Sequence, residues 1–200
     1  MGRSRSGNNR SGGRRPATPR AAPPTDAPDA GDAPASTASL ASATLPRVFN
    51  GVGYRPLTDA GRARALFDFA AIPWPERVAF AWGAWMSAAA GERMVGAVAA
   101  ERHSTAVMLH GPVVVTGDGP DEPLEVAGQL LAAAIDHATA LGGVTLYARP
   151  QGLDRVWVRF GFIPVPEVAL PAVLAGRPGA GLYAWRGGSA LWTLREAAEA

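Results

Sequence analysis

The sequence predicts an α+β fold, with a mixed, mostly antiparallel β-sheet and helices on both faces of that sheet. Three observations support this prediction. Short apolar segments bounded by turn residues indicate strands, residues 122–141 carry one continuous helical stripe, and residues 93–165 follow the order strand, strand, loop, long helix, strand, short helix, strand. Residues 47–200 are numerous enough to bury a single core.

The first expected elements are a strand at Val52–Leu57 and a helix at Ala60–Ala70. Thr58-Asp59 offers an N-cap for the helix, because a short polar side chain there accepts a hydrogen bond from a free helix amide. The proline-rich segment 72–75 ends the helix. The stretch Val78–Ala88 is mainly apolar, and its periodicity leaves open whether it forms a strand or a helix.

Two more strands are expected before the longest helix. Ala90-Gly91-Glu92 predicts a hairpin turn, and Arg93–Glu101 the strand that follows it. Ala106–Val115 predicts the next strand, since its last three residues are β-branched. Residues 116–120, Thr-Gly-Asp-Gly-Pro, predict a loop.

The clearest helix in the sequence is Glu122–Leu141. Its apolar side chains recur at helical spacing, at Leu124, Ala127, Leu131, Ala134, Ile135 and Ala138. Gly142-Gly143 ends this helix, because glycine readily adopts the left-handed conformation that closes a helix C-terminus. A strand is expected at Val144–Ala148.

The last elements are shorter. Leu153–Phe160 predicts a short helix closed by Gly161. Strands are expected at Phe162–Val165 and Leu182–Trp185, and Leu191–Ala200 is weakly helical by composition. We therefore place the folded domain at residues 47–187 and a C-terminal extension at residues 188–200.

Residues 1–46 differ in composition from the rest of the chain. Leu40 and Leu45 are their large apolar side chains, so the segment cannot bury enough surface to offset its ordering entropy, and we expect a disordered arm. Six arginines and no acid lie in residues 1–20. A solvated tail is the expectation, and an arm that touches nucleic acid is the alternative; no aromatic residue lies among the arginines to stack on bases.

Composition excludes several kinds of chemistry. All 19 basic residues are arginines and the sequence has no cysteine, which excludes lysine Schiff bases, thiol nucleophiles and cysteine-ligated metals. The three histidines show no helical metal-site spacing, so we expect no metal. No apolar run is long enough to span a membrane and no secretory signal is evident, so a cytoplasmic protein is expected.

Three motifs point to a known family. The strand Val113–Val115 runs into a glycine-containing loop and a helix, residues 136–142 close that helix before the strand at 144–148, and residues 156–162 read Val-Trp-Val-Arg-Phe-Gly-Phe. Together with the element order, these segments resemble the Gcn5-related N-acetyltransferase (GNAT) family. The resemblance covers residues 50–187 and is strongest in their second half.

The resemblance implies a binding site for acetyl-CoA or another acyl-CoA, and an acyltransferase that acts on an amine acceptor. In the family, the strand before the long helix parts from its neighbour, its backbone pairs with the pantetheine arm, and the following loop and helix N-terminus hold the pyrophosphate. The matching residues in this sequence are Val113, Val114, Val115, Gly117, Gly119, Ala127 and Gly128.

The sequence departs from the family pattern at two places. In the phosphate loop, Glu122 stands where the family has a basic or amide side chain, and Glu125 stands at the first glycine. Carboxylates there repel phosphate. At the position of the family's general acid, a tyrosine, this chain has Trp157, whose indole N–H cannot protonate a thiolate and which we expect to be packed in the core.

Other side chains could carry the acid–base chemistry. His110, at the centre of the third strand, and Tyr147, on the strand after the long helix, are the candidate catalytic residues. Glu101 could reach a substrate amine or be a solvated strand end. Arg149 and its neighbours Arg155 and Arg159 could supply the positive charge that the loop lacks, or pair with acids on the surface.

Two functions therefore remain open. One is an acyl-CoA-dependent N-acyltransferase, whose acceptor the sequence does not identify. The other is a non-catalytic GNAT-fold protein that senses a ligand or binds a partner, which the missing loop glycine and Trp157 favour. The oligomeric state is left open.

Overall fold

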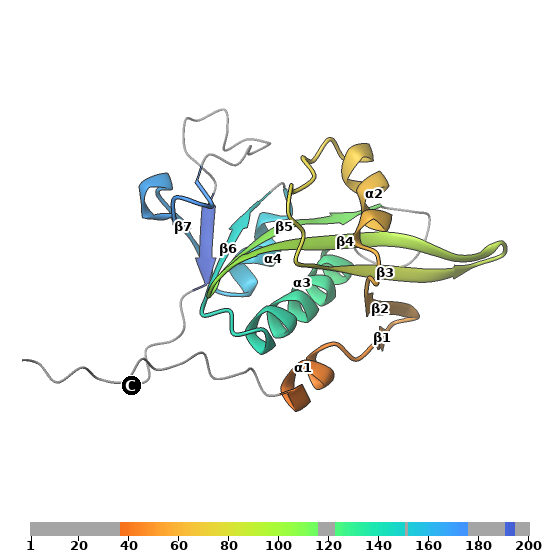
Figure 1. Cartoon of the computed structure of the whole chain (residues 1–200). Coiled ribbons are helices and arrows are strands. Elements are labelled where there is room, and N and C mark those ends of the chain that lie inside the picture. The colour runs from red at the N-terminus through yellow and green to blue at the C-terminus, as the bar shows by residue number, and fades with distance from the viewer. Residues whose placement is uncertain (1–36, 116–122, 151, 176–190, 195–200) are drawn as a thin grey trace, which may run out of the picture. The chain divides into compact units, whose positions relative to one another are not determined.

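The structure is a computed structural model that describes residues 37–115, 123–150, 152–175 and 191–194. Within these residues eight strands form one sheet, in the spatial order β1-β2-β3-β4-β5-β6-β8-β7. The strands are β1 (Arg47–Phe49), β2 (Val52–Pro56), β3 (Phe80–Ala88), β4 (Gly91–His103), β5 (Ala106–Val114), β6 (Thr145–Arg149), β7 (Phe162–Val165) and β8 (Leu191–Leu194). All neighbours are antiparallel except β5 and β6, which are parallel. The predicted mixed, mostly antiparallel sheet is confirmed (Figure 1).

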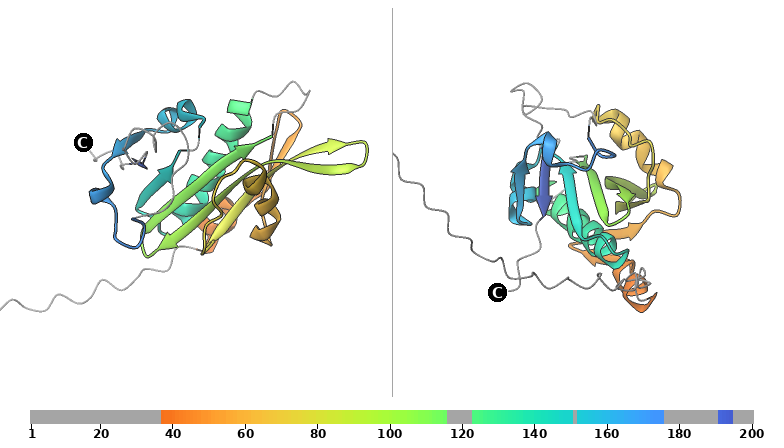
Figure 2. Two further views of the ribbon diagram at one scale, coloured as in Figure 1. Left: turned by 90° about the horizontal axis from the view of Figure 1, so that it is seen from above. Right: turned by 60° about the vertical axis from the view of Figure 1, so that its left-hand side comes forward.

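Helices cover both faces of the sheet, as predicted (Figure 2). A 3-10 turn, η1 (Ala60–Ala63), continues into α2 (Arg64–Phe69) and covers one face of β3, β4 and β5. The long helix α3 (Pro123–Ala140) covers the opposite face. Two short helices, α1 (Thr37–Ala43) and α4 (Asp154–Arg159), contact α3.

The main core lies between the sheet and α3. Alternate residues of β3, β4 and β5 face the helix there, among them Trp82, Val98 and Leu109, and they meet Leu130 and Leu131 of α3. The alternating set on the other face, which includes Ala81, Ala97 and Ala99, packs against η1 and α2 around Phe67. Because both faces are covered, β3 is apolar through six consecutive residues.

The stretch Val78–Ala88 therefore contains a strand that is covered on both faces. Its continuous apolar run has no polar–apolar alternation, so periodicity alone does not distinguish it from a buried helix. The Asp59 cap is present: its side chain accepts a hydrogen bond of 2.9 Å from the Gly61 amide. The helix that it caps begins as the 3-10 turn η1 and ends at Phe69.

Three regions differ from the expectations. Residues 37–43, within the segment expected to be disordered, form α1, and Arg47–Phe49 adds β1 at the sheet edge. Leu191–Leu194 is strand β8, so its expected helical character was wrong. It pairs with β6 and β7, and this pairing decides the conformation of a segment with little intrinsic preference. Residues 1–36 and the strand expected at Leu182–Trp185 lie outside the described residues.

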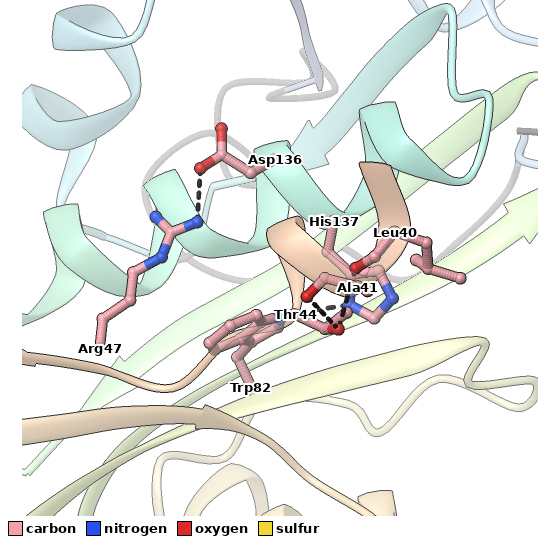
Figure 3. Close-up of polar contacts among 7 residues, drawn as sticks. All are labelled: Leu40, Ala41, Thr44, Arg47, Trp82, Asp136 and His137. Carbon is pink, nitrogen blue, oxygen red and sulfur yellow. Dashed lines mark hydrogen bonds and ion pairs between the residues drawn. The ribbon is translucent and has the colours of Figure 1, made fainter. Parts of the chain in front are cut away.

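A buried histidine joins α3 to the sheet (Figure 3). The Nε1 of Trp82 on β3 donates a hydrogen bond of 3.2 Å to Nδ1 of His137, and the Phe80 ring stacks on the imidazole with 4.1 Å between ring centroids. Burial without a negative partner disfavours the imidazolium, so desolvation lowers the pKa of His137 below 6.5. Nearby, Arg47 of β1 and Asp136 of α3 form an exposed ion pair of 2.7 Å.

The lowered pKa of His137 predicts acid sensitivity. The unfolded chain binds a proton at this group more readily than the folded chain does, so the contribution of His137 to the free energy of unfolding is complete above about pH 6.5 and is lost as the pH drops below it. One group contributes a slope of at most about 1.4 kcal/mol per pH unit. Chemical denaturation between about pH 5.5 and 7.5 measures it.

The control is His137→Asn, whose side-chain oxygen can still accept from Trp82 but does not titrate. We expect this variant to be less stable than the wild type at neutral pH and to have a shallower slope over the same range. Equal slopes in the two proteins would contradict the assignment.

Candidate functional site

Strands β5 and β6 part near the middle of the sheet. Residues 106–110 of β5 pair with residues 145–149 of β6, and His110–Arg149 is the last pair. β5 continues to Val114, but β6 ends at Arg149 and is followed by Pro150. Beyond His110, β5 therefore continues without a β6 partner among the described residues.

A bulge in β5 coincides with the parting. The β4–β5 register shifts between Ala97 and Ala99, opposite Gly111. Gly111 has a φ of +92°, and a Cβ at this position would lie 3.0 Å from the Val113 amide nitrogen and 3.2 Å from the Ala97 carbonyl oxygen. Glycine is required here by both the conformation and the close approach of β4.

The ladder with β4 decides which peptide groups of β5 face the gap. The Val115 amide donates to the Val95 carbonyl at 2.8 Å, and Val113 and Val114 lie opposite Ala97 and Gly96. Hydrogen-bonded and non-hydrogen-bonded pairs alternate in an antiparallel ladder, so Val113 and Val115 are bonded to β4 and Val114 turns its peptide groups to the other side. Of the three valines predicted to contact a ligand through their backbone, Val114 is therefore the one whose peptide groups point away from β4.

The predicted phosphate-binding residues fall into two groups. Gly117 and Gly119 lie outside the described residues. Ala127 and Gly128 lie in the second turn of α3, where helix amides bond within the helix, so the free amides are those of the first turn, at Leu124 and Glu125. Ala127 packs in the core, while no described heavy atom lies within 4 Å of a Cβ built on Gly128. Gly128 is itself buried, but it has room for a Cβ among the described residues.

The acid in the first turn of α3 is partly neutralised. Glu125 accepts a hydrogen bond of 3.2 Å from Nε2 of Gln129 and lies 3.8 Å from Nη1 of Arg159 on α4. Arg159 thus brings positive charge to this helix end. Arg155 is exposed.

Charged side chains gather where β5 and β6 part, on the sheet face that α2 covers. Glu101 of β4 is 0% exposed, and His110 of β5 and Arg149 of β6 are each 5% exposed. The Nε2 of His110 lies 2.9 Å from Oε1 of Glu101. The second oxygen, Oε2, lies 3.6 Å from Nε2 of His103.

The interpretation of Glu101 as a solvated strand end and of Arg149 as a surface residue was wrong. A signal was available for Glu101: it follows the run Val-Ala-Ala and lies two residues from Ala99, hence on the same buried face. For Arg149 the sequence held no comparable signal, because its burial depends on segments distant in the chain.

The other candidate catalytic residue, Tyr147, lies on β6 on the same face as Arg149. It is half-buried, opposite Met108, and packs against Met108 with Val165, Leu170 and Leu174. Trp157 is fully buried in the main core, with its ring centroid 4.9 Å from that of Phe162, so the expected packing role is confirmed. In the part of the chain that is described, no group of three or more His, Asp or Glu is placed to hold a metal, and no helix is long and apolar enough to cross a membrane.

No protein-family model and no curated protein matches the sequence. Among solved structures, N-acetylglutamate synthase from Neisseria gonorrhoeae in complex with coenzyme A and N-acetyl-glutamate matches 74% of this chain and 35% of its own, at 17% identity and a TM-score of 0.52. The same enzyme with coenzyme A and L-arginine matches 72% of this chain and 33% of its own, at 15% identity and a TM-score of 0.50.

This chain has the GNAT fold. It spans about a third of the length of the synthase. A probable GNAT-family acetyltransferase from Chromobacterium violaceum also matches, over 76% of this chain and 91% of its own, at 12% identity and a TM-score of 0.45. At these identities the likeness concerns the fold.

The two glycines of the site predict opposite responses to an added methyl group. Gly111→Ala places a Cβ against the β4 backbone at a positive φ, so we expect a loss of about 1–3 kcal/mol in the free energy of unfolding. Gly128→Ala is the matched control in a helix with open space, and we expect it to be neutral or to gain up to about 1 kcal/mol. Urea denaturation measures both, and equal effects would contradict the bulge.

Proposed function

We propose that this protein is an acyl-CoA-dependent N-acyltransferase that transfers an acetyl or other acyl group to an amine. The observation that carries the proposal is the end of the β5–β6 ladder at His110–Arg149, beyond which the peptide groups of Val114 point away from β4, in a chain with the GNAT fold. The solved synthase structures contain coenzyme A, which supports the same class of ligand here.

Three parts of this chain would hold the acyl-CoA. Val114 offers one N–H and one C=O to the amide groups of the pantetheine arm, as a neighbouring strand would. The first-turn amides of α3, at Leu124 and Glu125, would face the phosphates, where the helix dipole favours negative charge. Arg159, beside Glu125, offsets the acid at that helix end. Gly128 leaves room beside the second turn.

His110 is the proposed base. Acyl transfer needs the acceptor ammonium to lose a proton before the amine attacks the thioester carbonyl, and an imidazole is suited to take that proton near neutral pH. The C–N bond forms, the C–S bond breaks and the CoA thiolate leaves. Tyr147 is the candidate that returns a proton to the thiolate, from the β6 face that also carries Arg149.

A binding protein without catalysis is the second candidate. Trp157 is packed in the core at the family's acid position, and Glu125 occupies the phosphate-facing helix turn, both of which favour ligand binding without transfer. Binding of acyl-CoA without turnover of any amine would decide for this function.

The test is titration calorimetry with acetyl-CoA, followed by a thiol-release assay over a panel of primary amines. We expect saturable binding by the wild type and a loss of at least tenfold in affinity for Gly128→Leu, which fills the open space beside α3. Gly128→Ala is the control and should bind as the wild type does. Absence of binding to the wild type at millimolar acetyl-CoA would overturn the proposal.

A further inference from the structure

Two arginines from different elements converge on one tryptophan. The guanidinium carbon of Arg55 on β2 lies over the ring of Trp85 on β3, 4.4 Å from its centroid, and that of Arg62 on η1 lies 4.8 Å from the same centroid. The two guanidinium carbons are therefore at most about 9 Å apart, the sum of these two distances. Segments that are distant in the fold thus bring two positive charges to one ring.

Trp85 is better explained by this contact than by core packing. It is 7% exposed but belongs neither to the main core nor to the apolar cluster under α2. Its indole N–H is buried and has no hydrogen-bond partner among the described residues, which lowers stability and which a phenyl or aliphatic side chain would avoid. Tryptophan is, however, the side chain whose face attracts a cation most strongly.

Gly83 makes room for the indole. A Cβ built on Gly83 would lie 2.9 Å from Nε1 of Trp85 and 2.9 Å from Cδ2 of Leu57, a side chain that packs with the α2 cluster. Gly83 lies opposite Arg55 in the β2–β3 ladder. The indole therefore turns back along β3 toward Arg55, on the face of the sheet that η1 and α2 cover.

The positive charge at this ring is only partly neutralised. Arg55 forms an ion pair of 2.6 Å with Glu92 of β4, and both side chains are well exposed. No described carboxylate lies within ion-pair distance of Arg62, and Asp59 on the same turn accepts from the Gly61 amide. The tryptophan ring carries no charge to offset a guanidinium. Arg62 therefore keeps its charge and its hydrogen-bond donors for an anion.

We propose that Arg55 and Arg62, held over Trp85, bind a doubly charged anionic group, either a phosphate or a small dicarboxylate. Such a group can place oxygen atoms within hydrogen-bond reach of two guanidinium groups that are this close together. The planar fork of arginine donates parallel hydrogen bonds to these oxygens. Glu92 already presents a carboxylate to Arg55, and an exposed ion pair of this kind is weak enough for a ligand to displace.

This site is separate from the backbone proposed to bind acyl-CoA. Arg55, Gly83, Ala97 and Val113 form one row across β2, β3, β4 and β5. Neighbouring strands are about 4.8 Å apart, so the Cα atoms of Arg55 and Val113 are separated by about 14 Å along the row. The inference therefore goes beyond the proposed function and does not depend on it.

The test is an NMR titration of the wild-type protein with sodium phosphate and, separately, with succinate. Ionic strength is held constant with sodium chloride, which also supplies the reference anion. The signal followed is the indole N–H of Trp85, assigned by its loss in Trp85→Phe. We expect a saturable shift at millimolar concentration of at least one of the two dianions and no saturable shift with chloride. The dianion that saturates identifies the ligand as a phosphate, a dicarboxylate or either.

Three variants locate the site. Arg62→Gln should weaken binding at least about tenfold, because hydrogen bonds to a charged group are lost. Arg64→Gln is the matched control: Arg64 is exposed on the same segment and lies 3.8 Å from Asp68, so its loss should leave the affinity within about twofold. Glu92→Gln removes the carboxylate that competes for Arg55 and should tighten binding at least about threefold.

Four results would overturn the inference. These are a wild type without a saturable shift, equal losses in Arg62→Gln and Arg64→Gln, unchanged affinity in Glu92→Gln, and shifts confined to the amides of Leu124 and Glu125 at the start of α3. The last result would assign the anion to the proposed acyl-CoA site instead. A protein that binds phosphate or succinate at Trp85 but no acetyl-CoA would overturn the proposed function alone.

Discussion

The pairing between β5 and β6 runs from Ala106–Thr145 to His110–Arg149 and stops there. These are the parallel neighbours of the sheet, and parallel strands need a crossover, which α3 provides. The crossover sets α3 against the face of β5, while β5 itself runs on to Val114. The end of the ladder and the position of Val114 beyond it therefore have one cause: β5 is longer than its parallel neighbour β6.

Three polar side chains lie close to the end of the β5–β6 ladder. His110 and Arg149 are its last pair, and Glu101 reaches His110 from β4. A sheet covered on both faces would normally fill such positions with apolar side chains. Here one carboxylate, one guanidinium and one imidazole are buried close to the end of the β5–β6 ladder. Compact alanines on β4 leave room for them.

Local pattern was enough to predict most elements. Three features each follow from residues that are close in the sequence: the apolar stripe of α3, the Asp59 cap and the β-branched end of β5. The structure contains all three. Strand β8 and the burial of Arg149 were not predictable, because both depend on segments far apart in the chain. The choice of Val114, among the three valines predicted to contact a ligand through their backbone, also needed the structure. The bulge at Gly111 determines which peptide groups of β5 face β4. Glu101 could have been found from its spacing to Ala99.

The most direct measurement is amide hydrogen exchange of Val113, Val114 and Val115 by NMR, with and without saturating acetyl-CoA. A gap that takes the pantetheine arm predicts rapid exchange at Val114 in the free protein and strong protection on binding, with little change at Val113 and Val115, which are already bonded to β4. A Val114 amide that is protected in the free protein, or that stays unprotected in the saturated one, would contradict the account.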